Sequence, residues 1–341
     1  MTYSRSILPR CIAALLLFVS ACKDDPTSPE HFTVSLSALN LTRLESGQGH
    51  YELWISFPEG HSSNLAKRNH GDEAYVSFGK FNLSADNTQL LSLAGQAMSF
   101  TPHHEVDINL ALDAIVTIEL EGDQDDELGS RILAGGFSGS DREANAYLST
   151  GAEDAFDYDY RAATAAYVLT TPTTNDSTDF RSGIWWIKSS SSISAGIDKL
   201  PVLADTSGWR YEGWLIDRAN SRAYSTGKFL ASAAADADRA GTTAGADGVD
   251  QDGDGRGDGF AFPGQDFIQS SNGVPAFLQL DNGSFEARLT LEPEPDNSSA
   301  PFFLTLLTDV TIGPSLSRNH SPQSMDNRAS AFPSATVTIK R

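Results

Sequence analysis

The chain has 341 residues, and its 45 Asp and Glu side chains outnumber its 24 Lys and Arg side chains, which gives a formal net charge of −21. Such a charge argues against nucleic acid as a partner, because phosphate contacts need a basic surface. Hydrophobic residues make up 40% of the chain, including 18 Phe, 9 Tyr and 5 Trp, so wholesale disorder is excluded. The length is sufficient for two domains of ordinary size.

Residues 1–21 are typical of a secretory signal peptide. Arg5 and Arg10 precede an apolar run over residues 11–19, which has about half the length that a membrane span needs. The end of this run, Val19-Ser20-Ala21-Cys22, resembles the lipobox of bacterial lipoproteins. The resemblance implies cleavage before Cys22 and acylation of this residue. Residues 22–31 would then be a lipidated tether, with the membrane as a partner through the lipid anchor.

The tether begins with Lys23-Asp24-Asp25, which resembles the surface-export signal of lipoproteins in the Bacteroidota and also suits an ordinary charged tether. We therefore expect the chain in the bacterial cell envelope, lipid-anchored at the outer membrane or the cell surface. The sequence does not decide between the periplasmic side and the cell-surface side of the membrane. Cys11 and Cys22 are the only two cysteines. Since the signal contains the first and the lipid consumes the second, the mature chain is expected to form no disulfide.

Alternation of apolar and polar residues predicts an all-β protein. The alternating segments are roughly five to ten residues long, are separated by turn-forming residues, and are each expected to form a half-buried strand. Residues 141–148 and 229–240 are the main candidates for short helices. The clearest predicted strands cover residues 32–41, 51–57, 75–81, 115–120, 210–216, 285–291 and 335–339.

Three sequence landmarks occur twice in the same order. Residues 51–55 (YELWI) reappear as residues 211–215 (YEGWL), and residues 77–81 (SFGKF) reappear as residues 225–229 (STGKF). The third landmark is a strand end followed by an acidic turn. This repetition predicts a duplication and hence two tandem β-sandwich-like domains, residues 32–156 and 157–341. In the third landmark, residues 117–121 with the turn 122–126 are matched to residues 288–292 with the turn 293–297.

The second copy combines a Tyr-x-x-Trp strand at residues 211–214, a Gly-x-Phe strand at 227–229 and a closing strand from Leu289 that runs into an acidic, Pro-rich turn. In this combination it resembles the extracytoplasmic C-terminal domain of anti-sigma-K factors, over about half of each copy. The resemblance implies a β-sandwich-like fold and an envelope module for sensing or protein interaction. Such factors carry a sigma-binding region and a membrane span, which a lipidated Cys22 replaces here, so sequestration of a sigma factor is not expected.

Asp250, Asp252, Asp254 and Asp258 lie in an Asp- and Gly-rich run and are the candidate metal ligands. Alternate carboxylates on a loop turned by glycine supply the hard oxygens that Ca²⁺ prefers. An EF-hand loop would carry a bidentate Glu where Ala261 stands, and the spacing looks more like the calcium loops of thrombospondin type 3 repeats. A calcium site and a solvated loop both stay open, and Ca²⁺ is the one cofactor that the sequence suggests.

No catalytic residues are expected. His103 and His104 are adjacent, so on a strand they would point to opposite faces and would not share a zinc ion. Residues 77–80 and 225–228 both have the Ser-x-x-Lys spacing of penicillin-recognising enzymes. In an alternating strand, however, the Ser and the Lys are expected on opposite faces. Carboxylate pairs such as Asp123 with Asp125 and Glu292 with Glu294 are interpreted as turn residues.

Trp185, Trp186, Trp209 and Trp214 leave two interpretations open. On an exposed flat face they would be stacking platforms for a sugar, and buried they would be part of the core. We expect a non-enzymatic, envelope-anchored lipoprotein that acts as an interaction or sensing module with an unknown protein or glycan partner. A carbohydrate-binding lipoprotein and an unrecognised hydrolase are the alternatives.

Overall fold

The computed structural model describes residues 32–58, 73–123, 125, 127–171, 178–189, 194–237, 262–268, 270, 274–296, 298–315 and 322–341. Residues Phe32–Arg341 form one compact unit. The predicted lipidation residue Cys22 and the predicted calcium ligands Asp250, Asp252, Asp254 and Asp258 lie outside the described residues, so these two sites stay predictions. Among the described residues, no helix has the length and apolar composition needed to cross a membrane.

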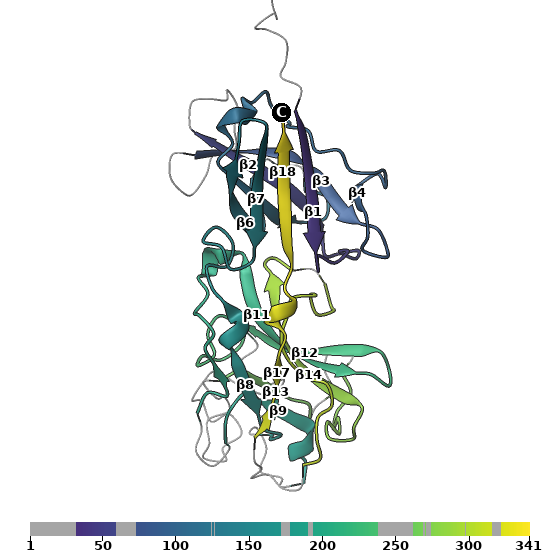
Figure 1. Ribbon diagram of the computed structural model, residues 1–341. Coiled ribbons are helices and arrows are strands. Elements are labelled where there is room, and N and C mark those ends of the chain that lie inside the picture. Colours follow the sequence, from purple (N-terminus) through teal and green to yellow (C-terminus); the bar gives the residue numbers. More distant parts are fainter. Residues whose placement is uncertain are drawn as a thin grey trace, which may run out of the picture. The chain divides into compact units, whose positions relative to one another are not determined.

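The fold is all-β, as the alternation predicted, and its largest sheet has eight strands in the order β1-β18-β7-β6-β5-β2-β3-β4. Neighbouring strands pair antiparallel throughout this sheet, and Figure 1 shows β18 beside β1 and β7. The strands are β1 (Thr33–Leu39), β2 (His50–Pro58), β3 (Glu73–Leu83), β4 (Leu90–Ser92), β5 (Asp113–Glu119), β6 (Ser130–Gly139), β7 (Glu143–Ser149) and β18 (Ser334–Lys340).

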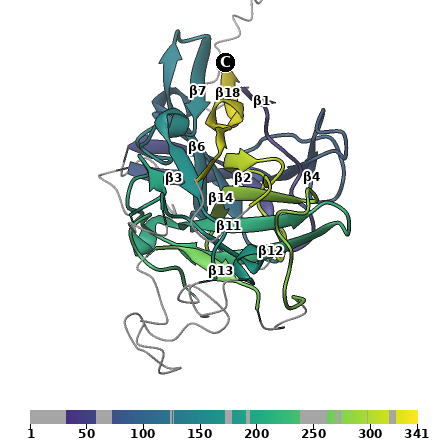
Figure 2. The same ribbon diagram turned by 90° about the horizontal axis from the view of Figure 1, so that it is seen from below.

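A second, five-stranded sheet has the order β12-β11-β14-β15-β17, and Figure 2 shows β12, β11 and β14 side by side. Two smaller sheets, β10-β8-β16 and β13-β9, accompany it. Their strands are β8 (Thr164–Tyr167), β9 (Gly183–Trp185), β10 (Ile197–Asp198), β11 (Trp209–Asp217), β12 (Arg222–Phe229), β13 (Gly264–Asp266), β14 (Phe285–Pro293), β15 (Thr305–Asp309), β16 (Gln323–Ser324) and β17 (Asp326–Asn327). Short 3₁₀ helices are η1 (Ile108–Leu110), η2 (Tyr160–Ala162), η3 (Phe180–Ser182), η4 (Asp205–Ser207) and η5 (Ala329–Ala331).

The described residues of the two windows expected to form helices do not form them. Residues 141–148 fall mainly in β7, where Ala144, Ala146 and Leu148 are buried on alternate positions, which is the period of a strand. In the window 229–240, β12 ends at Phe229, and the described residues up to Ala237 form turns. The alanine content of both windows favoured helix, but tertiary pairing overrides so weak a preference.

The expected division into residues 32–156 and 157–341 differs from the observed arrangement. The last strand, β18, belongs to the eight-stranded sheet and pairs with β1 and β7. One hydrophobic cluster contains buried side chains from both sides of the expected boundary. Near that boundary, Phe156 packs edge-on against Trp209 with ring centroids 4.9 Å apart. The chain therefore crosses into the second half and returns, so β18 ties the two halves into one unit.

The sequence repeat corresponds to an equivalent set of three strands in each half. In the first half β2 lies between β3 and β5, and in the second half β11 lies between β12 and β14. Tyr51 faces Phe81 across β2 and β3, as Tyr211 faces Phe229 across β11 and β12. The same equivalence holds on the other side, where Glu52 faces Thr117 and Glu212 faces Thr290.

The pairing also corrects the third landmark by two residues. Thr117, Ile118 and Glu119 correspond to Thr290, Leu291 and Glu292, not to residues 288–290 as the sequence comparison had it.

A β-bulge interrupts the same place in both copies. The register of β2 on β3 shifts between Leu53 and Trp54, and the register of β11 on β12 shifts between Glu212 and Trp214. A glycine with a positive φ lies at each bulge, Gly79 at 129° and Gly227 at 95°. The bulge places one extra residue in β3 and in β12, as glycine in this conformation commonly allows.

The bulge overturns one expectation about side-chain direction. Ser77 and Lys80 were expected on opposite faces of their strand, as were Ser225 and Lys228. The Ser77 hydroxyl instead donates to Glu52, and the Lys80 ammonium lies 3.7 Å from the same carboxylate. An extra residue between the two positions changes the alternation by one, which brings a Ser and a Lys three residues apart to the same face.

We predict that Gly227→Ala destabilises the chain more than Gly283→Ala does. Both glycines have a positive φ, but Gly283 borders open space. A Cβ at Gly227 would lie 2.5 Å from Cγ of Asp236, whereas one at Gly283, φ 83°, would meet nothing within 4 Å. Gly283→Ala should cost about 1 to 2 kcal/mol from its left-handed backbone alone. Gly227→Ala should cost at least about 3 kcal/mol because overpacking adds to that strain. Urea unfolding of the two variants measures this, and equal losses would contradict the role given to the bulge.

Candidate functional site

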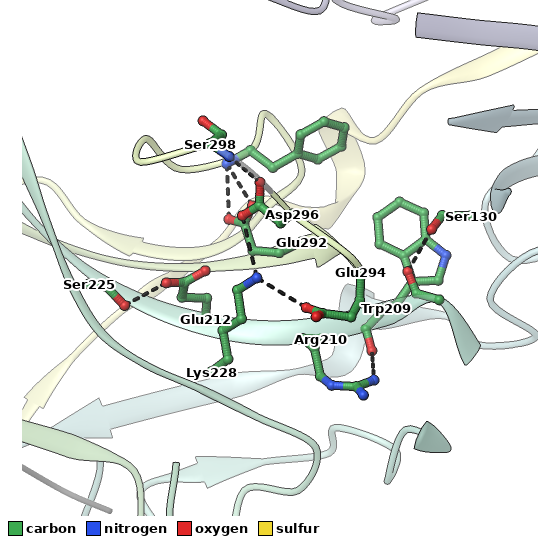
Figure 3. Close-up of polar contacts among 12 residues, drawn as sticks. Ser130, Trp209, Arg210, Glu212, Ser225, Lys228, Glu292, Glu294, Asp296 and Ser298 are labelled. Atoms are coloured by element: carbon green, nitrogen blue, oxygen red, sulfur yellow. Dashed lines mark hydrogen bonds and ion pairs between the residues drawn. The ribbon is translucent and has the colours of Figure 1, made fainter. Parts of the chain in front are cut away.

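A group of buried charged side chains lies beside the bulge of the second half. We call Glu212, Glu292, Asp296 and Lys228 the second cluster. Glu212 comes from the middle of β11, Lys228 from β12, Glu292 from the end of β14 and Asp296 from the turn that follows. Figure 3 shows the four side chains converging. Glu212 is 4% exposed and Glu292 is 1% exposed, which is rare for carboxylates.

Three donors hold Glu292 in place. Its Oε1 accepts from the backbone N–H of Phe302 at 2.9 Å and from the indole N–H of Trp214 at 3.2 Å. The Thr290 hydroxyl donates to the same carboxylate, and Trp214 also donates to Thr290 at 3.0 Å. These three donors fix the position and direction of the buried carboxyl group, and each of them favours its ionised form.

The remaining members are held by the lysine and by a tight turn. The Lys228 ammonium lies 3.1 Å from Oε2 of Glu294 and 3.5 Å from Oδ2 of Asp296. The backbone N–H of Ser298 donates to Oδ1 of Asp296 at 2.7 Å. Ser225 donates to Oε1 of Glu212. One ammonium therefore faces several carboxylates, and the group carries an excess of negative charge when all are ionised.

The first half contains an equivalent group at the equivalent positions, Glu52, Glu119, Asp123 and Lys80, which we call the first cluster. Trp54 donates its indole N–H to Thr117 at 2.9 Å, and Thr117 donates to Glu119, as in the second half. The N–H of Gly129 donates to Glu119 at 3.0 Å, in the role of Phe302. Hence the buried polar group recurs along with the strands.

The lysines of the two clusters differ in their partners. Lys80 lies 2.7 Å from Oδ2 of Asp123 and so pairs directly with a member of the first cluster. Its counterpart Lys228 has its shortest contact with Glu294, which lies outside the second cluster. Glu121 stands at the position that corresponds to Glu294, but it accepts from the backbone N–H of Gly47 at 2.9 Å.

Burial raises the pKa values of the glutamates in both clusters. Desolvation raises the pKa of Glu292 to about 8, against the opposing effect of its hydrogen bonds from Thr290 and Phe302. Desolvation likewise raises the pKa values of Glu212 and Glu52 to about 7, although the hydrogen bond from Ser225 or Ser77 opposes it. The charged forms of these carboxyls are thus held in an environment that disfavours them.

One oxygen of each central glutamate has no hydrogen-bond partner. Oε2 of Glu212 and Oε2 of Glu52 are both buried, and neither accepts a hydrogen bond. Oε2 of Glu52 does lie 3.7 Å from the Lys80 ammonium. Among the described residues, each of the two groups Glu52, Glu119, Asp123 and Glu212, Glu292, Asp296 has ligand-type atoms that all lie within 4.8 Å of one another.

Both clusters open onto one cleft of about 800 Å³. Glu119 and Asp123 line it from the first half, and Glu294 and Asp296 line it from the second. Among the described residues that line it, Arg131 is the one basic side chain. The carboxylates of the lining are those of Glu119, Asp123, Asp125, Glu127, Glu153, Asp154, Asp157, Glu294 and Asp296. The arrangement can attract and hold cations, because like charges that line a low-dielectric cleft reinforce one another.

The sugar-platform interpretation of the tryptophans is wrong. Trp185 and Trp186 are 0% exposed, Trp209 is 2% exposed and Trp214 is 3% exposed. Trp54 and Trp214 are buried at equivalent places, which confirms the interpretation of this pair as core residues. His103 and His104 lie in a loop and belong to neither of the metal-type groups found in the described part of the chain.

Sequence reasoning noticed several members of the clusters but assigned them other roles. Glu292, Glu294 and Asp123 were interpreted as turn residues, and they do lie at or just after strand ends. Glu52 and Glu212 were treated only as parts of a repeated motif. The sequence did contain one signal for the clusters, which was a glutamate at the same place inside a predicted strand in both copies. Charged residues are rare at buried strand positions, so their recurrence indicates a specific role.

Comparison of the chain with known protein families, with curated proteins and with solved structures found no match.

We predict that the free energy of unfolding falls as the pH rises from about 5 to about 8 in a buffer without divalent cations. Raised carboxyl pKa values mean that the folded state keeps protons that the unfolded chain has released. This contribution is complete below about pH 4.5 and is lost as the pH rises through about 7 to 8. Urea unfolding over this range measures the slope.

Glu292→Gln should make that slope smaller, because the amide does not titrate. The exposed Glu143→Gln removes the same formal charge at the surface and is the control. A parent protein whose stability rises over this range, or equal slopes for Glu292→Gln and the parent, would contradict the assignment.

Proposed function

We propose that this chain is an envelope-anchored lipoprotein and that its folded part is a non-enzymatic interaction or sensing module, related to the outer domain of anti-sigma-K factors. Its ligand-binding surface is the acidic cleft onto which both clusters open. The ligand that this surface suits is a basic polypeptide segment of another envelope protein. The lipid on Cys22 would keep the module at the membrane where such a partner resides.

The observation that carries this proposal is the composition of the cleft. Its described lining combines nine carboxylates with one guanidinium, that of Arg131, which lies 3.3 Å from Asp154. Lys80 and Lys228 pair with three more of these carboxylates, those of Asp123, Glu294 and Asp296. The other five, Glu119, Asp125, Glu127, Glu153 and Asp157, have no ion pair among the described residues, and this excess of negative charge favours a positively charged ligand and accelerates its approach. Residues from both halves contribute, so the surface requires the duplicated architecture.

One further observation weighs against sugar recognition. Trp185 and Trp186 are fully buried and offer no stacking face to a sugar. The carbohydrate-binding alternative therefore loses the feature on which it depended.

We predict that a fluorescent oligo-arginine peptide binds the cleft and that binding weakens with salt, as exposed charge pairs require. Replacing three exposed cleft carboxylates together, in Glu127→Gln, Glu153→Gln and Asp157→Asn, should weaken binding roughly tenfold, because each exposed pair contributes about 0.5 kcal/mol. Fluorescence anisotropy measures the affinity.

A matched triple variant separates the cleft from the net charge of the chain. Asp141→Asn, Glu143→Gln and Asp326→Asn remove the same number of charges at exposed positions outside the cleft. This control should retain the affinity of the parent within about threefold. Equal losses in the two triple variants would show that the peptide responds only to overall charge, and the proposed site would be wrong.

The anchor has a separate test. Cys22→Ser removes the thiol that the lipid needs, so the variant should leave the membrane fraction while the parent remains in it after a high-salt wash. Fractionation followed by immunoblotting measures the distribution. A variant that sediments with membranes as the parent does would overturn the lipoprotein assignment and would leave the cleft untouched.

A further inference from the structure

We propose that the second cluster, Glu212, Glu292 and Asp296 beside Lys228, is a binding site for a divalent cation, with Ca²⁺ as the ion that fits best. The first cluster is a weaker copy of the same site. This inference goes beyond the proposed function, because it concerns a buried group of carboxylates of which Asp296 lines the cleft, and not the exposed carboxylates that would contact a peptide. It is also separate from the Asp250 loop.

The separation of the ligand atoms is compatible with a calcium coordination sphere. One carboxylate oxygen from each of Glu212, Glu292 and Asp296 lies within 4.8 Å of the other two. Oxygens on opposite sides of a calcium ion are about 4.8 Å apart, since each lies about 2.4 Å from the metal, and neighbouring ligands are closer. Mg²⁺ requires a smaller sphere and stricter octahedral geometry, and a set of oxygens without imidazole or thiolate does not favour Zn²⁺.

A buried oxygen without a hydrogen-bond partner points to a missing ligand. Oε2 of Glu212 is buried and accepts no hydrogen bond, although Ser225 donates to the other oxygen of the same carboxylate. Such an atom carries a desolvation cost that a cation would remove. The equivalent atom, Oε2 of Glu52, is also without a hydrogen bond, so the feature recurs with the duplication.

The scaffold presents the ligand carboxylates in a fixed geometry. Glu292 is held by Trp214, Thr290 and the N–H of Phe302, and Asp296 is held by the N–H of Ser298. Such outer contacts orient metal ligands and reduce the entropy lost on binding. Asp296 also lines the cleft, which gives an ion and its remaining water ligands a path to the cluster.

The lysine explains why the two sites differ in strength. Lys228 has its shortest contact, 3.1 Å, with Glu294 and lies 3.5 Å from one ligand, Asp296, so it forms no ion pair with Glu212 or Glu292. In the first cluster Lys80 lies 2.7 Å from Asp123 and 3.7 Å from Glu52, and it occupies two of the three ligands. A bound ion there must displace an ammonium, which lowers its affinity.

Terbium luminescence tests the site directly, because Tb³⁺ replaces Ca²⁺ among hard oxygen ligands. Trp214 donates to Glu292, so an ion in the second cluster lies next to an indole that can transfer excitation to it. The detergent-solubilised full chain is first stripped with EDTA. It carries Asp250→Asn, Asp252→Asn, Asp254→Asn and Asp258→Asn, so that the Asp-rich loop does not contribute.

Titration with Tb³⁺ at about pH 8, where carboxylates are free to bind, should give tryptophan-sensitised emission that Ca²⁺ displaces. Glu212→Gln should weaken Tb³⁺ binding at least tenfold, while the matched variant of the first half, Glu52→Gln, should leave this emission nearly unchanged. Urea unfolding in EDTA checks that both variants are folded.

Absence of sensitised emission in the parent, or emission that Glu212→Gln leaves unchanged, would overturn the proposal. Loss of emission in Glu52→Gln with retention in Glu212→Gln would overturn the assignment to the second cluster. The oligo-arginine measurement reports on the exposed cleft carboxylates, so its failure and the failure of the ion site are distinguishable.

Discussion

The glycine-bearing β-bulge at Gly79, repeated at Gly227, is the constraint on which both charged clusters depend. The extra residue brings a serine and a lysine three positions apart to the same face of one strand, where they meet the glutamate of the neighbouring strand. Without it, strict alternation would send Ser77 and Lys80 to opposite faces. Both halves contain the same bulge, the same register and the same Trp–Thr–Glu chain of hydrogen bonds, so these three features form one structural unit that occurs twice.

Buried carboxylates cost stability, and their presence in both halves calls for a physical reason. Desolvation raises the pKa values of Glu52, Glu212 and Glu292, and an apolar residue at any of these positions would avoid that cost. A cation site would supply this reason. Burial removes the stabilisation of the carboxylate charge by water, and a bound cation restores it. In the proposal made here, Asp296 belongs to the ion site and also lines the cleft, so ion binding and partner binding would share one surface.

The strands were predictable from the sequence, whereas the clusters were not. Alternation correctly located seven strands, because apolar residues on every second position indicate a strand with one buried face. These strands are β1, β2, β3, β5, β11, β14 and β18. The same alternation predicted strands with one solvent-exposed face, on which Glu52 would lie. The structure instead buries β2 on both faces, so Glu52 lies in the interior. The effect of the bulge was not predictable either. A glycine within a strand indicates a bulge, but it does not show in which direction Ser77 and Lys80 would then point. The pairing of β18 with β1 and β7 was not predictable, because it joins segments far apart in the sequence and the repeated landmarks give no information about such pairing.

The central claim is that the duplicated bulge builds ion-binding clusters, and anomalous diffraction from crystals of the chain grown with Tb³⁺ tests it most directly. The account predicts equivalent bulges at Gly79 and Gly227 and an anomalous peak within about 2.6 Å of oxygens from Glu212, Glu292 and Asp296. It predicts a weaker peak or none at Glu52, Glu119 and Asp123. A map with peaks elsewhere and none among the carboxylates of the second cluster, with the Lys228 ammonium seated between them, would contradict it.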